Sequence, residues 1–301
     1  MRRAVLAAAI VTAVAFVSTD AQQPTFSTRV EVVRVDVSVM RGRRPVADLK
    51  ASDFEIFDNG VRQDIVGAST EPLPLDVVLA LDVSGSVEGA KLRELREAAE
   101  AFMAGLVNDD EVALLTFSHE LSLLRDLTAD RAAIATALQK PLAGGGTALR
   151  DGIYAALALR RSQARRDVVL VCTDGVDSGS WLTEDQLRTA ANRANALLYI
   201  VGLPPLHPDR RLTVREVMTQ GEISLTRLAE STGGRVWRAE SSDWLKRAFL
   251  EVLDEIRTRY VLTYNPTGVA AGGWHALDVR VKRSGLTLKA REGYFADPAL
   301  Y

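Results

Sequence analysis

The stretch DVVLALDVSGS, residues 76–86, decides how this chain of 301 residues is interpreted. Its first half is an apolar run, which is typical of a strand buried on both faces of a parallel sheet. Its second half places a carboxylate and two hydroxyls on alternate positions, at Asp82, Ser84 and Ser86. Open parallel sheets bind ligands beyond the carboxyl ends of their strands, so these three side chains are candidates for a binding site.

Outward from this stretch, apolar strands alternate with amphipathic helices over residues 74–257. Further strands are predicted at 111–117, 167–174 and 196–203. Helices are predicted at 91–107, 131–140, 148–161 and 243–257, and another begins at Thr183 with a capping box to Gln186. The alternation predicts an α/β domain with a doubly wound, mostly parallel Rossmann-like sheet.

Both flanks of this domain are β-rich, at residues 25–72 and 258–298. Valines alternate with polar residues from Val33 to Val39, which indicates a half-buried strand. Hairpins are predicted about Asn59-Gly60 and Ser284-Gly285. We expect the two ends to form one small β-sandwich into which the α/β domain is inserted. Two separate β units are the alternative.

The first residues indicate export. Two arginines, an apolar run from Ala4 to Val17 and small or polar residues up to Ala21 are typical of a cleaved signal peptide, residues 1–21. This predicts a secreted or periplasmic protein without a transmembrane span in the mature chain; an uncleaved membrane anchor is the alternative. Cys172 is the only cysteine, so no intrachain disulfide forms, and we expect it to be a buried apolar residue.

Charge does not identify a partner. The chain has 37 basic and 39 acidic residues and a formal net charge of -2, spread along the sequence. No basic face for nucleic acid or anionic lipid is indicated.

Two more oxygen-bearing side chains are expected beside the first three. Thr147 follows AGGG before a predicted helix, and Asp174 follows a predicted strand. Five such side chains from three loops suit a hard divalent cation, Mg²⁺ or alternatively Mn²⁺ or Ca²⁺. Two carboxylates at most cancel the charge of the ion, so an open position would bind a carboxylate of a partner. The alternative is that these are ordinary turn residues.

DVSGS, with GGGTAL and TDG, resembles the metal-ion-dependent adhesion site of von Willebrand factor A-type domains, over residues 74–257. The whole chain resembles the bacterial group of secreted von Willebrand factor A-related proteins. The resemblance implies that the hydroxyls of Ser84, Ser86 and Thr147 ligate the ion directly. It implies that Asp82 and Asp174 bind it directly or through water. It also implies that the last helix, residues 243–257, is the one whose movement alters metal coordination in the family.

Two segments are candidates for contact with a partner. Trp181 is predicted on the metal face, either as an anchor or packed under its own loop. Residues 203–217, with His207, follow another strand and are the second candidate. His119, His207 and His275 have no metal-ligand spacing and are interpreted as surface or turn residues.

These features predict a cation-dependent protein–protein interaction module of the adhesion type, which binds a protein or peptide carrying an Asp or Glu carboxylate. One rival is a structural or scaffolding protein of an envelope complex, in which the metal only rigidifies loops. The other is a metal-dependent hydrolase. No histidine or extra carboxylate accompanies the site as a general base, and the G-x-S-x-G motif is missing from DVSGSV, so we do not expect an enzyme.

Overall fold

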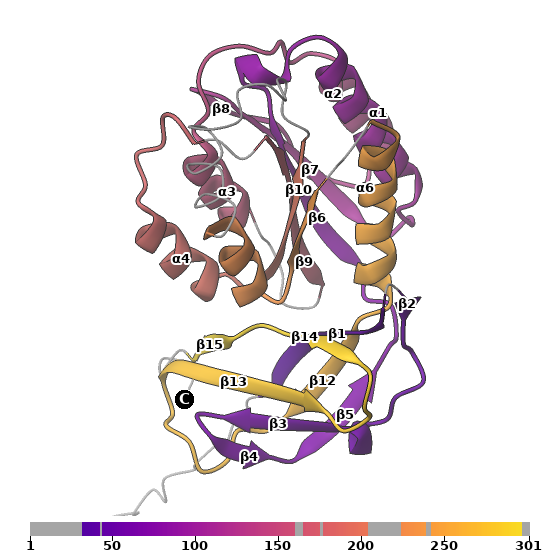
Figure 1. The fold of residues 1–301 in the computed structure, drawn as a ribbon, viewed down its shortest axis with the longest axis vertical. Coiled ribbons are helices and arrows are strands. Elements are labelled where there is room, and N and C mark those ends of the chain that lie inside the picture. Colours follow the sequence, from indigo (N-terminus) through magenta and orange to yellow (C-terminus); the bar gives the residue numbers. More distant parts are fainter. Residues whose placement is uncertain are drawn as a thin grey trace, which may run out of the picture. The chain divides into compact units, whose positions relative to one another are not determined.

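The computed structural model describes residues 32–42, 44–159, 165–174, 177–203, 224–238 and 242–296 (Figure 1). The signal peptide expected at residues 1–21 therefore lies outside the described residues. Within the described ranges, no helix is both long enough and apolar enough to cross a membrane.

A six-stranded sheet forms the centre of the α/β part. In spatial order its strands are β11 (Arg235–Arg238), β10 (Ala196–Gly202), β9 (Arg166–Thr173), β6 (Leu75–Asp82), β7 (Glu111–Phe117) and β8 (Leu121–Thr128). All neighbours are parallel except β7 and β8, which are antiparallel. This confirms the mostly parallel class expected from the sequence. The edge strands β8 and β11 were not expected.

Helices cover both faces of this sheet (Figure 1). All eight residues of β6 are buried, with Leu79 and Leu81 in one core cluster and Val78 and Ala80 in the other. The first cluster includes side chains of α1 (Ala90–Ala104), α2 (Arg131–Leu138) and α6 (Ser242–Arg257). The second includes side chains of α3 (Leu149–Ala158), α4 (Glu184–Arg193) and the helical residues 224–231. A strand covered on both faces has no polar side, which explains its continuous apolar run.

Two smaller antiparallel sheets are built from both ends of the described chain. The first contains β14 (Thr287–Lys289), β1 (Val33–Arg41), β12 (Tyr260–Tyr264) and β5 (Ile65–Ser69) in that order, with β2 (Arg44–Pro45) paired to β1. The second contains β15 (Gly293–Ala296), β13 (Gly273–Val281), β3 (Phe54–Asp58) and β4 (Val61–Gln63). Side chains from both sheets share one hydrophobic cluster, including Val35, Ile56 and Leu262. The domain limits expected from the sequence stay a prediction.

One of the two expected hairpins forms and the other does not. Strands β3 and β4 pair across Asn59 and Gly60, whose φ angles of 47° and 80° suit a two-residue hairpin turn. The hairpin about Ser284-Gly285 is wrong, because β14 pairs with β1 whereas β13 pairs with β3 and β15. This turn instead carries the chain from the four-stranded sheet to the five-stranded sheet. A period-two pattern indicates a strand but not its partner.

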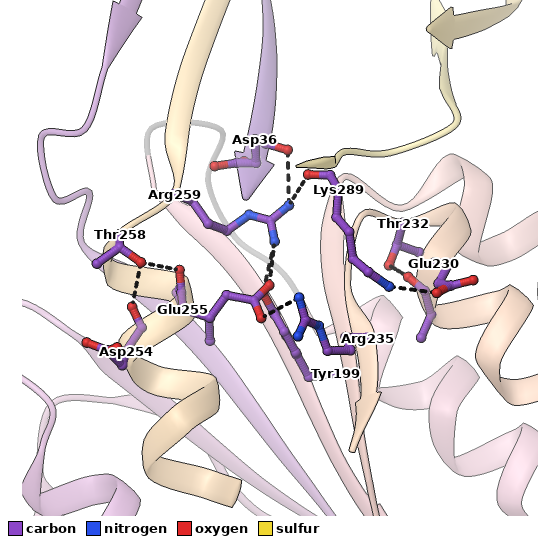
Figure 2. Close-up of polar contacts among 12 residues, drawn as sticks. Asp36, Tyr199, Glu230, Thr232, Arg235, Asp254, Glu255, Thr258, Arg259 and Lys289 are labelled. Carbon is purple, nitrogen blue, oxygen red and sulfur yellow. Dashed lines mark hydrogen bonds and ion pairs between the residues drawn. The ribbon is translucent and has the colours of Figure 1, made fainter. Parts of the chain in front are cut away.

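A buried polar network ties the end of α6 to the five-stranded sheet (Figure 2). Arg259 donates through Nη1 to Tyr199 Oη at 3.0 Å and lies 3.3 Å from Glu255 Oε1. Its Nη2 donates to the backbone carbonyls of Asp36, at 3.1 Å, and Lys289, at 3.4 Å. Burial alone would lower the pKa of Arg259, but the neighbouring Tyr199, Glu255 and Asp36 raise it overall, so the guanidinium stays charged.

Candidate functional site

The candidate site lies at the carboxyl ends of β6 and β9, the two central strands of the six-stranded sheet. Asp82 is the last residue of β6, and Ser84 and Ser86 follow in a turn that includes the 3-10 helix η2 (Gly85–Val87). The Ser84 N–H donates to Asp82 Oδ1 at 2.9 Å, and the hydroxyls of Ser84 and Ser86 are 3.0 Å apart. The turn therefore gathers three oxygen-bearing side chains at one strand end.

Asp82 is fully buried and tightly held. Thr173 Oγ1 donates to its Oδ2 at 2.7 Å. Burial raises the pKa of the Asp82 carboxyl, and nearby Asp174 adds to this, although hydrogen bonds from Ser84 and Thr173 act in the opposite direction. No local pattern indicates this role of Thr173, because only the pairing of β6 with β9 brings it to Asp82.

Asp174 directly follows β9. Strands β6 and β9 are parallel, with Leu81 opposite Cys172. The residues that follow the two strands therefore lie at the same end of the sheet, the carboxyl end of its strands. Oδ1 of Asp174 is buried and has no hydrogen-bond partner among the described residues. An unpaired buried acceptor is costly, and a cation held between Asp82 and Asp174 would satisfy it.

The third loop is rich in glycine and is hydrogen-bonded to the first. The Gly85 N–H donates to the Gly145 carbonyl at 3.0 Å, and the Gly144 N–H donates to the Val83 carbonyl at 2.9 Å. Gly145 has a φ of +76°, and a Cβ built there would lie 2.0 Å from His119 Nδ1. The positive φ therefore favours glycine at this position, and any other residue would also require the exposed His119 ring to move.

Thr147 is buried, and its backbone is fixed by the loop that follows β9. Its N–H donates to Ser178 Oγ at 2.8 Å, and its carbonyl accepts from the N–H groups of Ser178, at 2.9 Å, and Gly179, at 3.1 Å. It precedes Ala148, the N-cap of α3, so the helix begins slightly later than expected. Hydrogen bonds thus join the three loops that carry the five predicted residues.

Lys91, in the first turn of α1, is a charged residue of this site that the sequence analysis missed. Its side chain is 8% exposed, and Nζ donates to the Ser86 carbonyl at 3.4 Å. Burial lowers the pKa of Lys91, and the carboxylates of Asp174 and Asp82 counteract this. The available signal was its position one helical turn before Leu95, on the apolar stripe.

The predicted donor set consists of oxygen atoms, from two carboxylates and three hydroxyls. Such donors suit Mg²⁺, Mn²⁺ and Ca²⁺ and not softer metals. Within the described ranges, no three His, Cys, Asp or Glu side chains gather as a metal cluster. A cation here would therefore depend on hydroxyl and water ligands for the rest of its coordination.

Trp181 projects from the loop after β9. Its side chain is 94% exposed, so it is not packed under its own loop. The backbone N–H of Trp181 donates to Asp151 Oδ2, and the backbone N–H of Leu182 donates to Asp151 Oδ1, both at 2.9 Å. Ser178, three residues earlier, bonds to Thr147. The indole is thus exposed on a fixed loop that is hydrogen-bonded to the candidate site.

The other predicted residues have different outcomes. His207 lies outside the described residues, as do residues 204–223, so this candidate stays a prediction. His119 is exposed, as expected. Cys172 is buried, which raises the pKa of its thiol well above the ordinary value and fits the apolar role expected for it.

The structure corrects the position expected for His275. It is fully buried on β13, where its Nδ1 lies 2.8 Å from Asp58 Oδ1 and 3.2 Å from Tyr294 Oη. The surface or turn position expected for it is therefore wrong. Its partners lie on β3 and β15, which pair with β13 only through long-range contacts.

Residues 77–176 match the family model described as the von Willebrand factor type A domain. An uncharacterized protein of Synechocystis is 33% identical over 107 residues, which cover 34% of this chain and 26% of that protein. The inter-alpha-trypsin inhibitor heavy chain H2 of Mus musculus is 26% identical over 113 residues, which cover 36% of this chain and 12% of that protein. The similarity thus spans about a quarter or less of either relative.

Solved structures show the same fold. A von Willebrand factor type A structure from Catenulispora acidiphila has a TM-score of 0.52 and 14% identity, and the match covers 90% of this chain and 75% of that one. The vWF domain of the type V pili tip protein Mfa5 from Porphyromonas gingivalis has a TM-score of 0.50 and 14% identity, covering 66% and 99%. Residues 77–176 of this chain thus match the von Willebrand factor type A domain family, and the solved structures share its fold.

Proposed function

We propose that this chain is a divalent-cation-dependent protein-interaction module of the adhesion type, which binds a carboxylate of a partner protein or peptide. The hydroxyls of Ser84, Ser86 and Thr147 and the carboxylates of Asp82 and Asp174 hold the ion, which is Mg²⁺, Mn²⁺ or Ca²⁺. The observation that carries this proposal is the buried Oδ1 of Asp174, which lacks a hydrogen-bond partner among the described residues, at the strand end beside Asp82.

The orientation of Asp82 and the charge of the site suit an anionic partner. Thr173 holds one oxygen of Asp82 at 2.7 Å, and the Ser84 N–H holds the other at 2.9 Å, so the carboxylate is oriented in advance. The two carboxylates neutralise at most two charges, and the hydroxyls add none. A bound ion would therefore supply an electrophilic position that attracts an Asp or Glu side chain of the partner.

Trp181 is proposed as the apolar anchor of the same interaction. Asp151 accepts from the N–H groups of Trp181 and Leu182, so the loop is ordered before a partner arrives. Burial of a large aromatic side chain contributes about 2–3 kcal/mol. His207 is proposed, from the sequence, as a second contact.

Calorimetric titration with Mg²⁺ and Mn²⁺ tests the metal site. We expect the wild-type chain to bind one ion and Asp82→Ala to lose binding, because the variant removes a carboxylate held between Ser84 and Thr173. Asp185→Ala, at an exposed position on α4, is the matched control and should bind like wild type. A wild-type chain that binds neither of these ions, nor Ca²⁺, would contradict the proposal.

Partner capture from the native envelope fraction tests the interaction itself. Wild type should retain a partner that is released by EDTA and is not retained by Thr147→Ala. Trp181→Ala should retain less of it while binding Mn²⁺ normally. Capture that is unchanged by EDTA, with a lower Tm for the chelated protein, would favour a metal that only rigidifies the loops.

We also infer from the leader at residues 1–21 that the protein is secreted or periplasmic. N-terminal sequencing and fractionation of the protein expressed in a bacterial host test this inference. We expect processing near Ala21 and recovery outside the cytoplasm. A full-length chain in the membrane fraction would indicate an uncleaved anchor instead.

A further inference from the structure

We propose that Lys91 is a resident positive charge that weakens cation binding at the candidate site and takes the place of the ion when the ion is absent. This inference rests on the metal site proposed above. Lys91 would thereby set the concentration of free cation at which the site becomes loaded. The proposed role of Lys91 is electrostatic and does not include ligation of the ion, because a lysine ammonium has no lone pair to offer a metal.

The first step of the argument is the burial of the ammonium. Lys91 is 8% exposed at the start of α1, and its neighbours along the same helix face, Leu95 and Ala98, belong to the apolar core. Its hydrogen bond to the Ser86 carbonyl, at 3.4 Å, is long. A lysine is rarely this buried unless nearby charges compensate it.

The second step is the source of that compensation. Lys91 Nζ bonds to the Ser86 carbonyl, in the turn whose Ser84 N–H bonds to Asp82 Oδ1. Among the carboxylates, Asp174 and Asp82 most oppose the lowering of the Lys91 pKa by burial. Asp82 is itself fully buried, and Oδ1 of Asp174 has no hydrogen-bond partner in the described part of the chain. The ammonium and the two carboxylates therefore form one group of charges at the end of β6, with net charge -1 when all three are ionised.

The third step is the effect of an added divalent ion. The ion would share the two carboxylates with Lys91 and would be repelled by its charge at short range, in a region with little water. Removal of the charge should therefore tighten binding. If Lys91 instead only positions the Ser86 turn, its removal should loosen the ligands and weaken binding. The two roles predict changes of opposite sign.

The experiment compares Mn²⁺ binding by calorimetry in wild type, Lys91→Gln and Lys91→Met. Lys91→Gln removes the charge but keeps an N–H donor for the Ser86 carbonyl, and Lys91→Met removes both. We expect the dissociation constant of Lys91→Gln to fall roughly tenfold, because one nearby like charge is lost. The rise of Tm on adding Mn²⁺ should also be larger than in wild type.

Two controls complete the design. Lys246→Gln changes the net charge of the protein by the same amount, at an exposed position of α6, and should leave the dissociation constant unchanged. Lys91→Arg retains the charge and should bind no more tightly than wild type. If one Lys91 variant does not fold, judged by circular dichroism, the other two still measure the effect.

The outcomes separate the two proposals. If wild type and all variants fail to bind Mn²⁺, Mg²⁺ and Ca²⁺, the proposed metal site is wrong. If wild type binds and Lys91→Gln binds equally well or more weakly, the site stands and the inference about Lys91 is overturned. Tighter binding by Lys91→Gln, with Lys246→Gln unchanged, supports it.

Discussion

Replacement of Arg259 by methionine should destabilise the protein more than any single change at its surface. Arg259 is fully buried and Glu255, its ion-pair partner on α6, is 2% exposed. Methionine keeps much of the apolar stem but removes the charge and every donor. The variant would leave the Tyr199 hydroxyl and the carbonyls of Asp36 and Lys289 without the guanidinium that now bonds to them (Figure 2).

The size of the effect follows from the burial of the partner charge. Removal of one member of a buried ion pair costs about 3–5 kcal/mol, because the other charge stays buried. Arg235, 3.3 Å from Glu255 Oε2, still compensates part of this charge, which favours the lower half of the range. For a domain of this size, 1 kcal/mol lowers the Tm by about 2–4 °C, so a fall of roughly 10 °C is expected.

Urea denaturation followed by circular dichroism measures the change in the free energy of unfolding. Arg188→Met, which breaks a solvent-exposed pair with Asp185 on α4, is the matched control and should change stability little. A loss below about 1 kcal/mol in Arg259→Met would refute the reasoning. It would mean that water replaces the guanidinium and that the end of α6 is not tied to the five-stranded sheet.

Three further predictions concern other buried positions. Cys172, whose pKa is raised by burial, should react with Ellman's reagent only after the protein is unfolded; rapid labelling of the native protein would contradict its burial. Gly234→Ala should cost about 3 kcal/mol or more in urea denaturation, since its Cβ would lie 1.9 Å from the Leu198 carbonyl oxygen; an unchanged midpoint would argue against this contact. His275→Phe should cost about 2–3 kcal/mol by the same measurement, because the fully buried carboxylate of Asp58 loses a partner 2.8 Å away, and a variant as stable as wild type would show that the pair contributes little.

Local sequence patterns predicted those parts of the fold that depend on neighbours along the chain. The apolar run of β6 is buried on both faces, as expected. The capping box at Thr183 and Gln186 forms at the start of α4, with the Thr183 N–H donating to Gln186 Oε1 at 2.9 Å. These features are encoded within a few residues, so a single sequence is sufficient to find them.

The two edge strands of the large sheet escaped prediction for a physical reason. Strand β8 is mostly exposed and its pairing with β7 is irregular, so its side chains do not follow a simple alternation. Strand β11 has only four residues, too few for a periodic pattern to be recognised. An edge strand has one neighbour to bury it and therefore carries a weaker hydrophobic signal.

The sequence by itself determined the class of the central sheet and the positions of Asp82 and Asp174 just where β6 and β9 end. Only the tertiary structure decided that Thr173 holds Asp82, that Lys91 is buried with its Nζ on the Ser86 carbonyl, and that the chain changes sheets after β13. The reason is that periodicity reports which face of an element is covered, whereas the partner that covers it is chosen by strand pairing and packing between distant segments.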